Sequence, residues 1–239
     1  MLIRHLRIFV NEYDMTHILD NPIWWALNGE SRQLGQGTDQ LKYFFPEVSP
    51  FAALNAHTPE NFSSLFEVFK EDQFVVLFSP KSDLDPSPWT IVDKIPGLQM
   101  VFEGQLPQEV QAADIVELGE QHVARMLALT QIAPPGPFSQ RTIEFGGYNG
   151  IFSGEDLVAM AGERLRAGTY TEISAVCTHP DYAGRGFARR LIMHKVKQIT
   201  AAGRVPYLHV KSENTIAADL YQRMGFVIRS EMNFYILKR

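Results

Sequence analysis

Residues 171–200 read TEISAVCTHPDYAGRGFARRLIMHKVKQIT, and this stretch decides the fold of the chain. Thr171–Thr178 is rich in Thr, Ile, Val and Cys in an alternating pattern, which predicts a strand that ends before Pro180. After a turn that contains two glycines, apolar side chains recur at helical spacing, and Gly203 stands where a C-terminal cap belongs. The stretch therefore predicts a strand, a glycine turn and a helix that begins near Gly186.

The glycine turn has the composition of an anion site. At a helix start several backbone N–H groups lack intrahelical partners, and the helix dipole favours negative charge. Gly184, Gly186 and Ala188 keep side-chain bulk away, while Arg185 and Arg189 add positive charge. Such a turn suits a pyrophosphate.

Two common nucleotide motifs do not fit this turn. The dinucleotide fingerprint requires a third small residue, and the chain has Arg189 at that position. A Walker phosphate loop requires Gly-Lys-Ser/Thr, which occurs nowhere in the sequence.

The turn instead resembles the acetyl-CoA loop of the GNAT superfamily of N-acetyltransferases, Gln/Arg-x-x-Gly-x-Gly/Ala. In this chain the loop reads Ala183-Gly184-Arg185-Gly186-Phe187-Ala188, with Ala183 in place of the Gln or Arg. A second block, NTIAADLYQRMGF from Asn214 to Phe226, is similar to the family's Asn-x-x-Ala-x-x-Leu-Tyr-x-x-x-Gly-Phe. The two blocks stand in the family's order, and the resemblance covers about residues 112–239.

The resemblance implies a mixed α/β fold with a mostly antiparallel sheet and flanking helices. It also implies acetyl-CoA as the acyl donor and a primary amine as the acceptor, joined by direct attack in a ternary complex. The alternative is a catalytically silent acyl-CoA-binding or sensor module on the same fold, because fold alone does not establish activity.

Acetyl transfer requires backbone donors for the oxyanion and groups that carry the pantetheine arm. If strands 171–178 and 205–211 run parallel and splay apart, Val176 and Thr178 have backbone groups free to pair with the pantetheine amides. The N–H of Val176 then faces the thioester oxygen. The family's block assigns Asn214 to the pantetheine arm, and the alternative role of Asn214 is an N-cap.

The resemblance also assigns the proton transfers. Tyr221 matches the family's Leu-Tyr pair, which places a phenol near the thioester sulfur, so Tyr221 is the expected acid. Glu172 matches the strand glutamate of some members and is the expected base, with its pKa raised by burial or with a relaying water. The alternatives are a half-buried aromatic for Tyr221 and a surface charge near a strand start for Glu172.

Other chemistries find little support. Ser153 lacks the Gly-x-Ser-x-Gly spacing of a nucleophile elbow. His179, His194 and His209 are scattered and have no metal-ligand spacing, so no metal is expected. Cys177, the only cysteine, sits in the alternating strand pattern and is expected to be a small buried hydrophobe.

Charge and length indicate two domains, residues 1–109 and 110–239. The first carries 7 Lys+Arg against 15 Asp+Glu, net −8, and the second 15 against 12, net +3. A module of +3 is too weakly basic to predict nucleic-acid binding. No stretch is long and apolar enough for a membrane span, so a cytoplasmic protein is expected. The sequence does not distinguish a monomer from a homodimer.

Residues 1–109 predict an α/β domain with elements at 41–45, 59–69 and 74–79, followed by a loop at 79–96 that is rich in Pro and Asp. It is compatible with a degenerate copy of the acetyltransferase fold. Residues 110–239 predict the order βαβββαβαββ, with the last two strands at 227–230 and 233–237.

Overall fold

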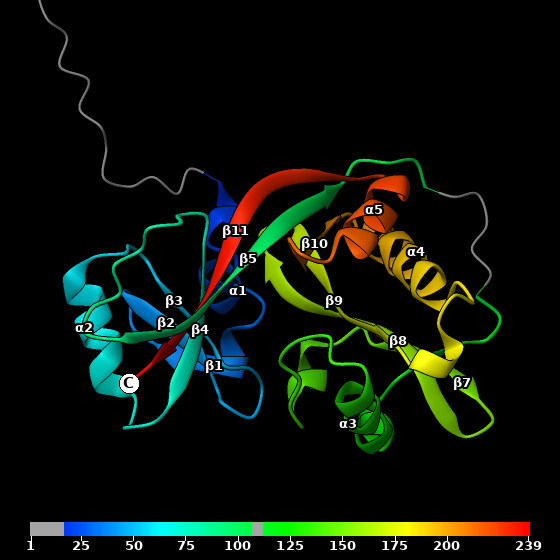
Figure 1. Cartoon of the computed structure of the whole chain (residues 1–239), viewed down its shortest axis with the longest axis horizontal. Coiled ribbons are helices and arrows are strands. Elements are labelled where there is room, and N and C mark those ends of the chain that lie inside the picture. Colours follow the sequence, from blue (N-terminus) through cyan, green and yellow to red (C-terminus); the bar gives the residue numbers. More distant parts are fainter. Residues whose placement is uncertain (1–16, 107–111) are drawn as a thin grey trace, which may run out of the picture.

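The computed structural model describes residues 17–106 and 112–239 (Figure 1). Its strands form one 11-stranded sheet in the order β1-β2-β3-β4-β11-β5-β10-β9-β8-β7-β6. Within the described residues only β3–β4 and β9–β10 pair in parallel, and the other pairs are antiparallel. The predicted mixed, mostly antiparallel sheet is confirmed.

The strands differ greatly in length. They are β1 Gly35–Gly37, β2 Leu41–Phe44, β3 Phe51–Leu54, β4 Phe74–Ser79, β5 Thr90–Phe102, β6 Ile115–Glu117, β7 Asn149–Ser153, β8 Asp156–Ala167, β9 Tyr170–Thr178, β10 Val205–Lys211 and β11 Phe226–Lys238. The predicted strand at 205–211 is confirmed, and the predicted hairpin at 148–164 is β7 and β8.

In the described part of the chain five α-helices flank the sheet, and most start where the sequence supplies a cap. They are α1 Pro22–Asn28, α2 Pro59–Val68, α3 Val123–Ile132, α4 Phe187–Ala201 and α5 Thr215–Arg223. Asn21, Thr58 and Asn214 each accept a hydrogen bond from a first-turn N–H with the side chain, and Pro22 and Pro59 occupy the first helical position. The start of α4 differs, because Gly186 caps it without a side chain.

The helices cover both faces of the sheet. Side chains of α1 and α3 share one apolar core with residues from both halves of the chain, including Phe44, Phe78, Met160 and Tyr207. On the opposite face, α4 and α5 pack over β5, β9, β10 and β11, and α2 packs over β2, β3 and β4. Figure 1 shows α2 and the α4–α5 pair at the two ends of the molecule.

Strands β5 and β11 join the two ends of the sheet. β5 pairs with β10 on one side and with β11 on the other, and β11 also pairs with β4 (Figure 1). The predicted boundary at 109/110 lies outside the described residues, and the division into two domains stays a prediction. The described strands on either side of it belong to one sheet.

Two sequence predictions were wrong in detail. The expected loop at 79–96 ends early, because strand β5 begins at Thr90. Pro96 is tolerated inside β5 because the pairing of β5 with β10 begins only at Gly97. The two expected final strands form one strand, β11, with a bulge between Ile228 and Ser230 where Arg229 has no partner in the register. Long antiparallel pairing with β5 holds β11 together across this bulge.

Among the described helices, none has the length and apolar character that a membrane span requires.

Candidate functional site

The site is built where two parallel strands separate. β9 and β10 pair only at Tyr170 with Val205, Thr171 with Pro206, and Glu172 with Tyr207; beyond Glu172 no further pair joins them in the described chain. The expectation that these strands run parallel and splay apart is confirmed. The splay exposes the backbone of β9 to a ligand.

A bulge in β9 increases this exposure. Ala175 has φ of +52°, a left-handed conformation that is rare for a residue with a Cβ. Neither Ala175 nor Val176 has a register partner on β8, although Ser174 and Cys177 on either side do. The backbone at 175–176 is therefore turned out of the normal ladder beside the gap between β9 and β10.

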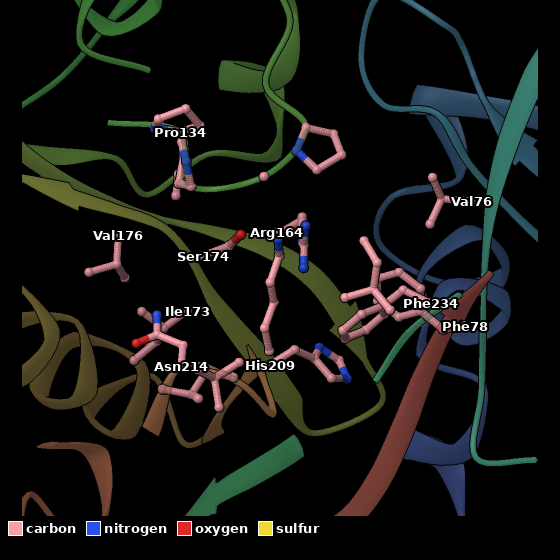
Figure 2. A pocket seen from close by; sticks show the side chains of 18 of the residues that line it. Val76, Phe78, Pro134, Arg164, Ile173, Ser174, Val176, His209, Asn214 and Phe234 are labelled. Atoms are coloured by element: carbon pink, nitrogen blue, oxygen red, sulfur yellow. The ribbon is translucent and has the colours of Figure 1, made fainter. Parts of the chain in front are cut away.

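A cleft of about 710 Å³ opens at this gap. One end is lined by Ile173–Val176 of β9, by Leu208–Lys211 of β10 and by Asn214 and Tyr221 of α5 and its cap. The other end is lined by the apolar side chains of Phe51, Val76, Phe78, Ile95, Phe234 and Ile236 and by the loop Pro134–Pro137. Figure 2 shows Val176 and Asn214 on one side, Val76, Phe78 and Phe234 on the other, and Arg164 and His209 between them.

The glycine turn lies at the start of α4 and does not line this cleft. Gly184 and Gly186 have φ of +76° and +77°, and an added Cβ would meet no atom within 4 Å at either position. Gly186 supplies no side-chain cap, so no side chain caps the first-turn N–H groups of α4. Ala183, Arg185 and Arg189 are exposed beside them. An exposed, uncapped helix start with left-handed glycines fits a phosphate group.

The aromatic ring of Tyr182 organises the turn. The Arg185 guanidinium lies over this ring at 4.6 Å, and Phe187 stacks on it with ring centroids 6.4 Å apart. Ala188 follows Phe187 in the first turn of α4 and is half-buried. The loop is thus anchored by its aromatic residues and leaves the glycine backbone open.

The other predicted donor contacts lie at the strand end and at α5. Val176 and Asn214 line the cleft, whereas Thr178 stands at the end of β9 with its hydroxyl buried and without a hydrogen-bond partner in the described part of the chain. The Asn214 side chain accepts a hydrogen bond from the N–H of Ala217 at 3.2 Å, so the alternative role as an N-cap is confirmed, while its contact with the pantetheine arm stays a prediction. Its position in the cleft wall leaves the amide group near any ligand there.

Tyr221 projects from α5 into the cleft wall. It is 9% exposed, and its ring packs 6.0 Å from that of Phe226. Burial raises the pKa of its phenol to about 12, so the hydroxyl keeps its proton at neutral pH. No side chain or backbone group within 17–106 or 112–239 forms a hydrogen bond with this hydroxyl.

Glu172 is buried beside Arg164 and His209, two residues that line the cleft, and forms an ion pair with Arg164. Its side chain is fully buried, and the Arg164 guanidinium donates to it from Nε at 2.8 Å and from Nη2 at 2.6 Å. Burial works to raise the pKa of Glu172, but the charge and hydrogen bonds of Arg164, with a hydrogen bond from His209, outweigh burial and lower the pKa to about 2. The expected rise of this pKa was wrong, because no sequence pattern indicated the guanidinium of Arg164 beside the carboxylate.

His209 continues the buried network. Its Nδ1 is 2.7 Å from Oε1 of Glu172, and its Nε2 is 2.9 Å from Nε2 of Gln99. Gln99 Nε2 also donates to the Leu19 carbonyl, and Arg229 donates to Gln99 Oε1, which fixes the orientation of this amide. Nε2 of His209 must then accept, so His209 is neutral and donates from Nδ1 to Glu172. Burial lowers the pKa of His209, and the hydrogen bond with Glu172 offsets this only in part.

Sequence reasoning missed Arg164, His209 and the aromatic wall of Phe51, Phe78 and Phe234. Arg164 lies in the predicted strand 157–164, and its alternation with neighbouring apolar residues gives no sign of an inward charge. His209 was considered only as a metal ligand. The aromatic residues come from β3, β4 and β11, which meet only in the folded sheet.

Cys177 is 7% exposed in the core, and burial raises the pKa of its thiol to about 12. The expectation of a small buried hydrophobe is confirmed.

Comparison with known proteins places this geometry in context. Residues 148–235 match the FR47-like protein family. Over 97 residues the chain is 36% identical to the N-alpha-acetyltransferase RimI of Mycobacterium tuberculosis; the match covers 39% of this chain and only 60% of that relative.

Two solved structures are similar along nearly the whole chain. A GNAT-family protein from Novosphingobium aromaticivorans is 35% identical with a TM-score of 0.87, and the match covers 93% of this chain and 99% of that one. A GCN5-related N-acetyltransferase from Kribbella flavida has a TM-score of 0.57 at 16% identity, with 91% and 93% covered, and supports the fold alone.

Proposed function

Because this chain belongs to the GNAT family of acetyltransferases, we propose that it transfers the acetyl group of acetyl-CoA to a primary amine. The single observation that carries this proposal is the splay between β9 and β10, which opens the cleft. Tyr221 lines one end of this cleft, and the apolar side chains that include Phe78 and Phe234 line the other end. Acetyl-CoA can enter the cleft from one end and the acceptor amine from the other, so that the thioester and the amine meet between the two ends.

The residues proposed to hold the donor are those of the turn, the strand end and the helix cap. The backbone of Gly184–Ala188 receives the pyrophosphate, with Arg185 and Arg189 nearby as counter-charges. Val176 and Thr178 offer backbone groups to the pantetheine amides in the manner of an added strand. Asn214 uses the part of its amide that the N-cap bond leaves free.

The proposed reaction is a single displacement. The neutral amine nitrogen attacks the thioester carbonyl carbon, a C–N bond forms, the C–S bond breaks, and the amine loses one proton while the CoA sulfur gains one. The N–H of Val176 in the bulge is the proposed donor to the carbonyl oxygen. Tyr221 is the proposed donor of the proton to sulfur. This role is supported by its place in the cleft wall and by its hydroxyl, which forms no hydrogen bond within the residues that the structure describes.

The role of Glu172 as the base stays a prediction from the family resemblance. Both of its oxygens accept hydrogen bonds from Arg164, and a pKa of about 2 makes it a weak proton acceptor at neutral pH. We favour a positioning role, in which Glu172 fixes Arg164 and His209, while the amine proton leaves through water in the open cleft.

The experiment is an assay of free-thiol release from acetyl-CoA with a panel of small amines, amino acids and peptides, with the acetylated product identified by mass spectrometry. Amine-dependent thiol release is the expected result. Tight acetyl-CoA binding without turnover on any amine would instead favour the silent acyl-CoA-binding module.

A further inference from the structure

The Arg164 guanidinium lines the cleft, and its Nη1 nitrogen has no hydrogen-bond partner among the residues that the structure describes. Nε and Nη2 are engaged by Glu172. The side chain keeps 13% of its area exposed and lines the cleft. A guanidinium can bind one carboxylate on each of two edges, so the Nη1–Nη2 edge is available to a second carboxylate.

Aromatic rings hold this guanidinium in place. It lies 4.8 Å from the centroid of Phe51 and 5.8 Å from that of Phe78. Phe78 in turn packs on Phe234 with centroids 4.7 Å apart. The free edge of Arg164 therefore sits beside an apolar, aromatic surface in the same cleft (Figure 2).

The proposed acetylation point lies in the same cleft as Arg164. Arg164 binds Glu172, and the bulge at Ala175–Val176, whose Val176 N–H is the proposed donor to the thioester oxygen, follows Glu172 on β9 and lines this cleft. In an α-amino acid the amine stands one carbon from the carboxylate, so a carboxylate held by Arg164 keeps the amine inside the cleft. Such an acceptor can turn its amine toward the bulge.

Resting on the acetyl transfer proposed above, we infer that the acceptor is a free α-amino acid with an apolar or aromatic side chain. Its carboxylate binds the Nη1–Nη2 edge of Arg164, its side chain packs on Phe51, Phe78 and Phe234, and its amine points toward the bulge in β9. Glu172 does not repel the carboxylate strongly, because its charge is paired with Arg164 on the opposite edge.

The test compares three ligands by calorimetry on the full chain saturated with CoA. L-Phenylalanine has both features, phenethylamine lacks only the carboxylate, and glycine lacks only the apolar side chain. We expect L-phenylalanine to bind about tenfold or more tightly than phenethylamine, as one charge-assisted hydrogen bond predicts, and about tenfold or more tightly than glycine, as burial of an aromatic side chain predicts. Equal or tighter binding of phenethylamine would overturn the carboxylate site, and equal binding of glycine would overturn the apolar one.

Variants locate the carboxylate. Arg164→Lys keeps the positive charge but removes the planar guanidinium that can bind a carboxylate through two N–H groups. The ratio of the phenylalanine affinity to the phenethylamine affinity should therefore fall toward one. Arg166→Lys is the matched control, because Arg166 lies on the same strand but pairs with Glu163 and Glu30, and it should keep the ratio. Lys211 is another positively charged residue that lines the cleft, and Lys211→Met removes its charge. If the affinity ratio falls toward one in Lys211→Met, the assignment of the carboxylate to Arg164 is wrong.

The two proposals fail separately in this design. If L-phenylalanine binds with the expected preference and no amine is acetylated, the acetyl transfer is wrong and the carboxylate site stands. If amines without a carboxylate are bound and acetylated best, the transfer stands and the acceptor class is wrong. Circular dichroism checks the fold of each variant, and the wild-type ligand comparison decides even if Arg164→Lys fails to fold.

Discussion

Replacing Glu172 with Gln should cost the protein about 3 kcal/mol of folding free energy at pH 7. This magnitude follows from the pKa of the Glu172 carboxyl, which falls from its ordinary value of 4.5 to about 2 in the folded protein, at about 1.4 kcal/mol per pKa unit. The substitution also leaves the charge of Arg164 buried without its partner, and breaking buried ion pairs typically costs about 3–5 kcal/mol.

The pH dependence has a definite sign. Because the folded pKa of Glu172 is lowered, its contribution is complete above the unfolded value of 4.5 and is lost as the pH falls toward 2. Urea unfolding followed by tryptophan fluorescence, on wild type and variant from pH 7 to pH 3, measures the difference directly. Other carboxylates titrate in both proteins and cancel in that difference.

A matched control is Glu144→Gln. Glu144 also makes a two-point ion pair with an arginine, Arg141, but these side chains are 36% and 44% exposed, and such surface pairs contribute about 0–1 kcal/mol. Should Glu172→Gln lose less than about 1 kcal/mol at pH 7, or lose the same amount at pH 7 and pH 3, the account of Glu172 as a buried, charged partner of Arg164 is wrong.

Four further predictions concern the proposed reaction. Gly186→Val should weaken acetyl-CoA binding about tenfold by calorimetry, because bulk and a left-handed φ obstruct the phosphate turn; Gly203→Val, at the other end of α4 with φ of +73°, should leave the affinity unchanged. Tyr221→Phe should lower kcat about a hundredfold with little change in acetyl-CoA affinity, and unchanged kcat would exclude Tyr221 as the acid. Glu172→Gln should keep both limbs of the pH–rate profile between about pH 5 and 9, since a group of pKa about 2 does not titrate there, whereas loss of the acidic limb would restore Glu172 as the base. Calorimetry should give one acetyl-CoA per chain, because the glycine turn occurs once, and a stoichiometry of two would reveal a donor site in residues 1–109.

Several elements depend on local patterns that can be read from neighbouring residues. Alternation predicted β9, and helical spacing and glycines predicted that α4 begins near Gly186. The N-cap of α5 was the alternative role of Asn214. These features depend on backbone conformation and hydrogen bonds within a few residues, so neighbours in sequence are enough to specify them. The same local blocks carried the family resemblance.

The electrostatics of the cleft and its apolar wall depend on contacts between residues far apart in the sheet. Glu172 looked like a base whose pKa burial would raise. The pKa is lowered instead, because the charge and hydrogen bonds of Arg164 on the adjacent strand, together with the hydrogen bond from His209, outweigh desolvation. Phe51 and Phe78 reach the cleft because β5 and β11 join the N-terminal strands to the acetyltransferase sheet. The pKa of a buried group depends on distances of a few ångströms to residues far away in sequence, and strand pairing across the sheet sets those distances.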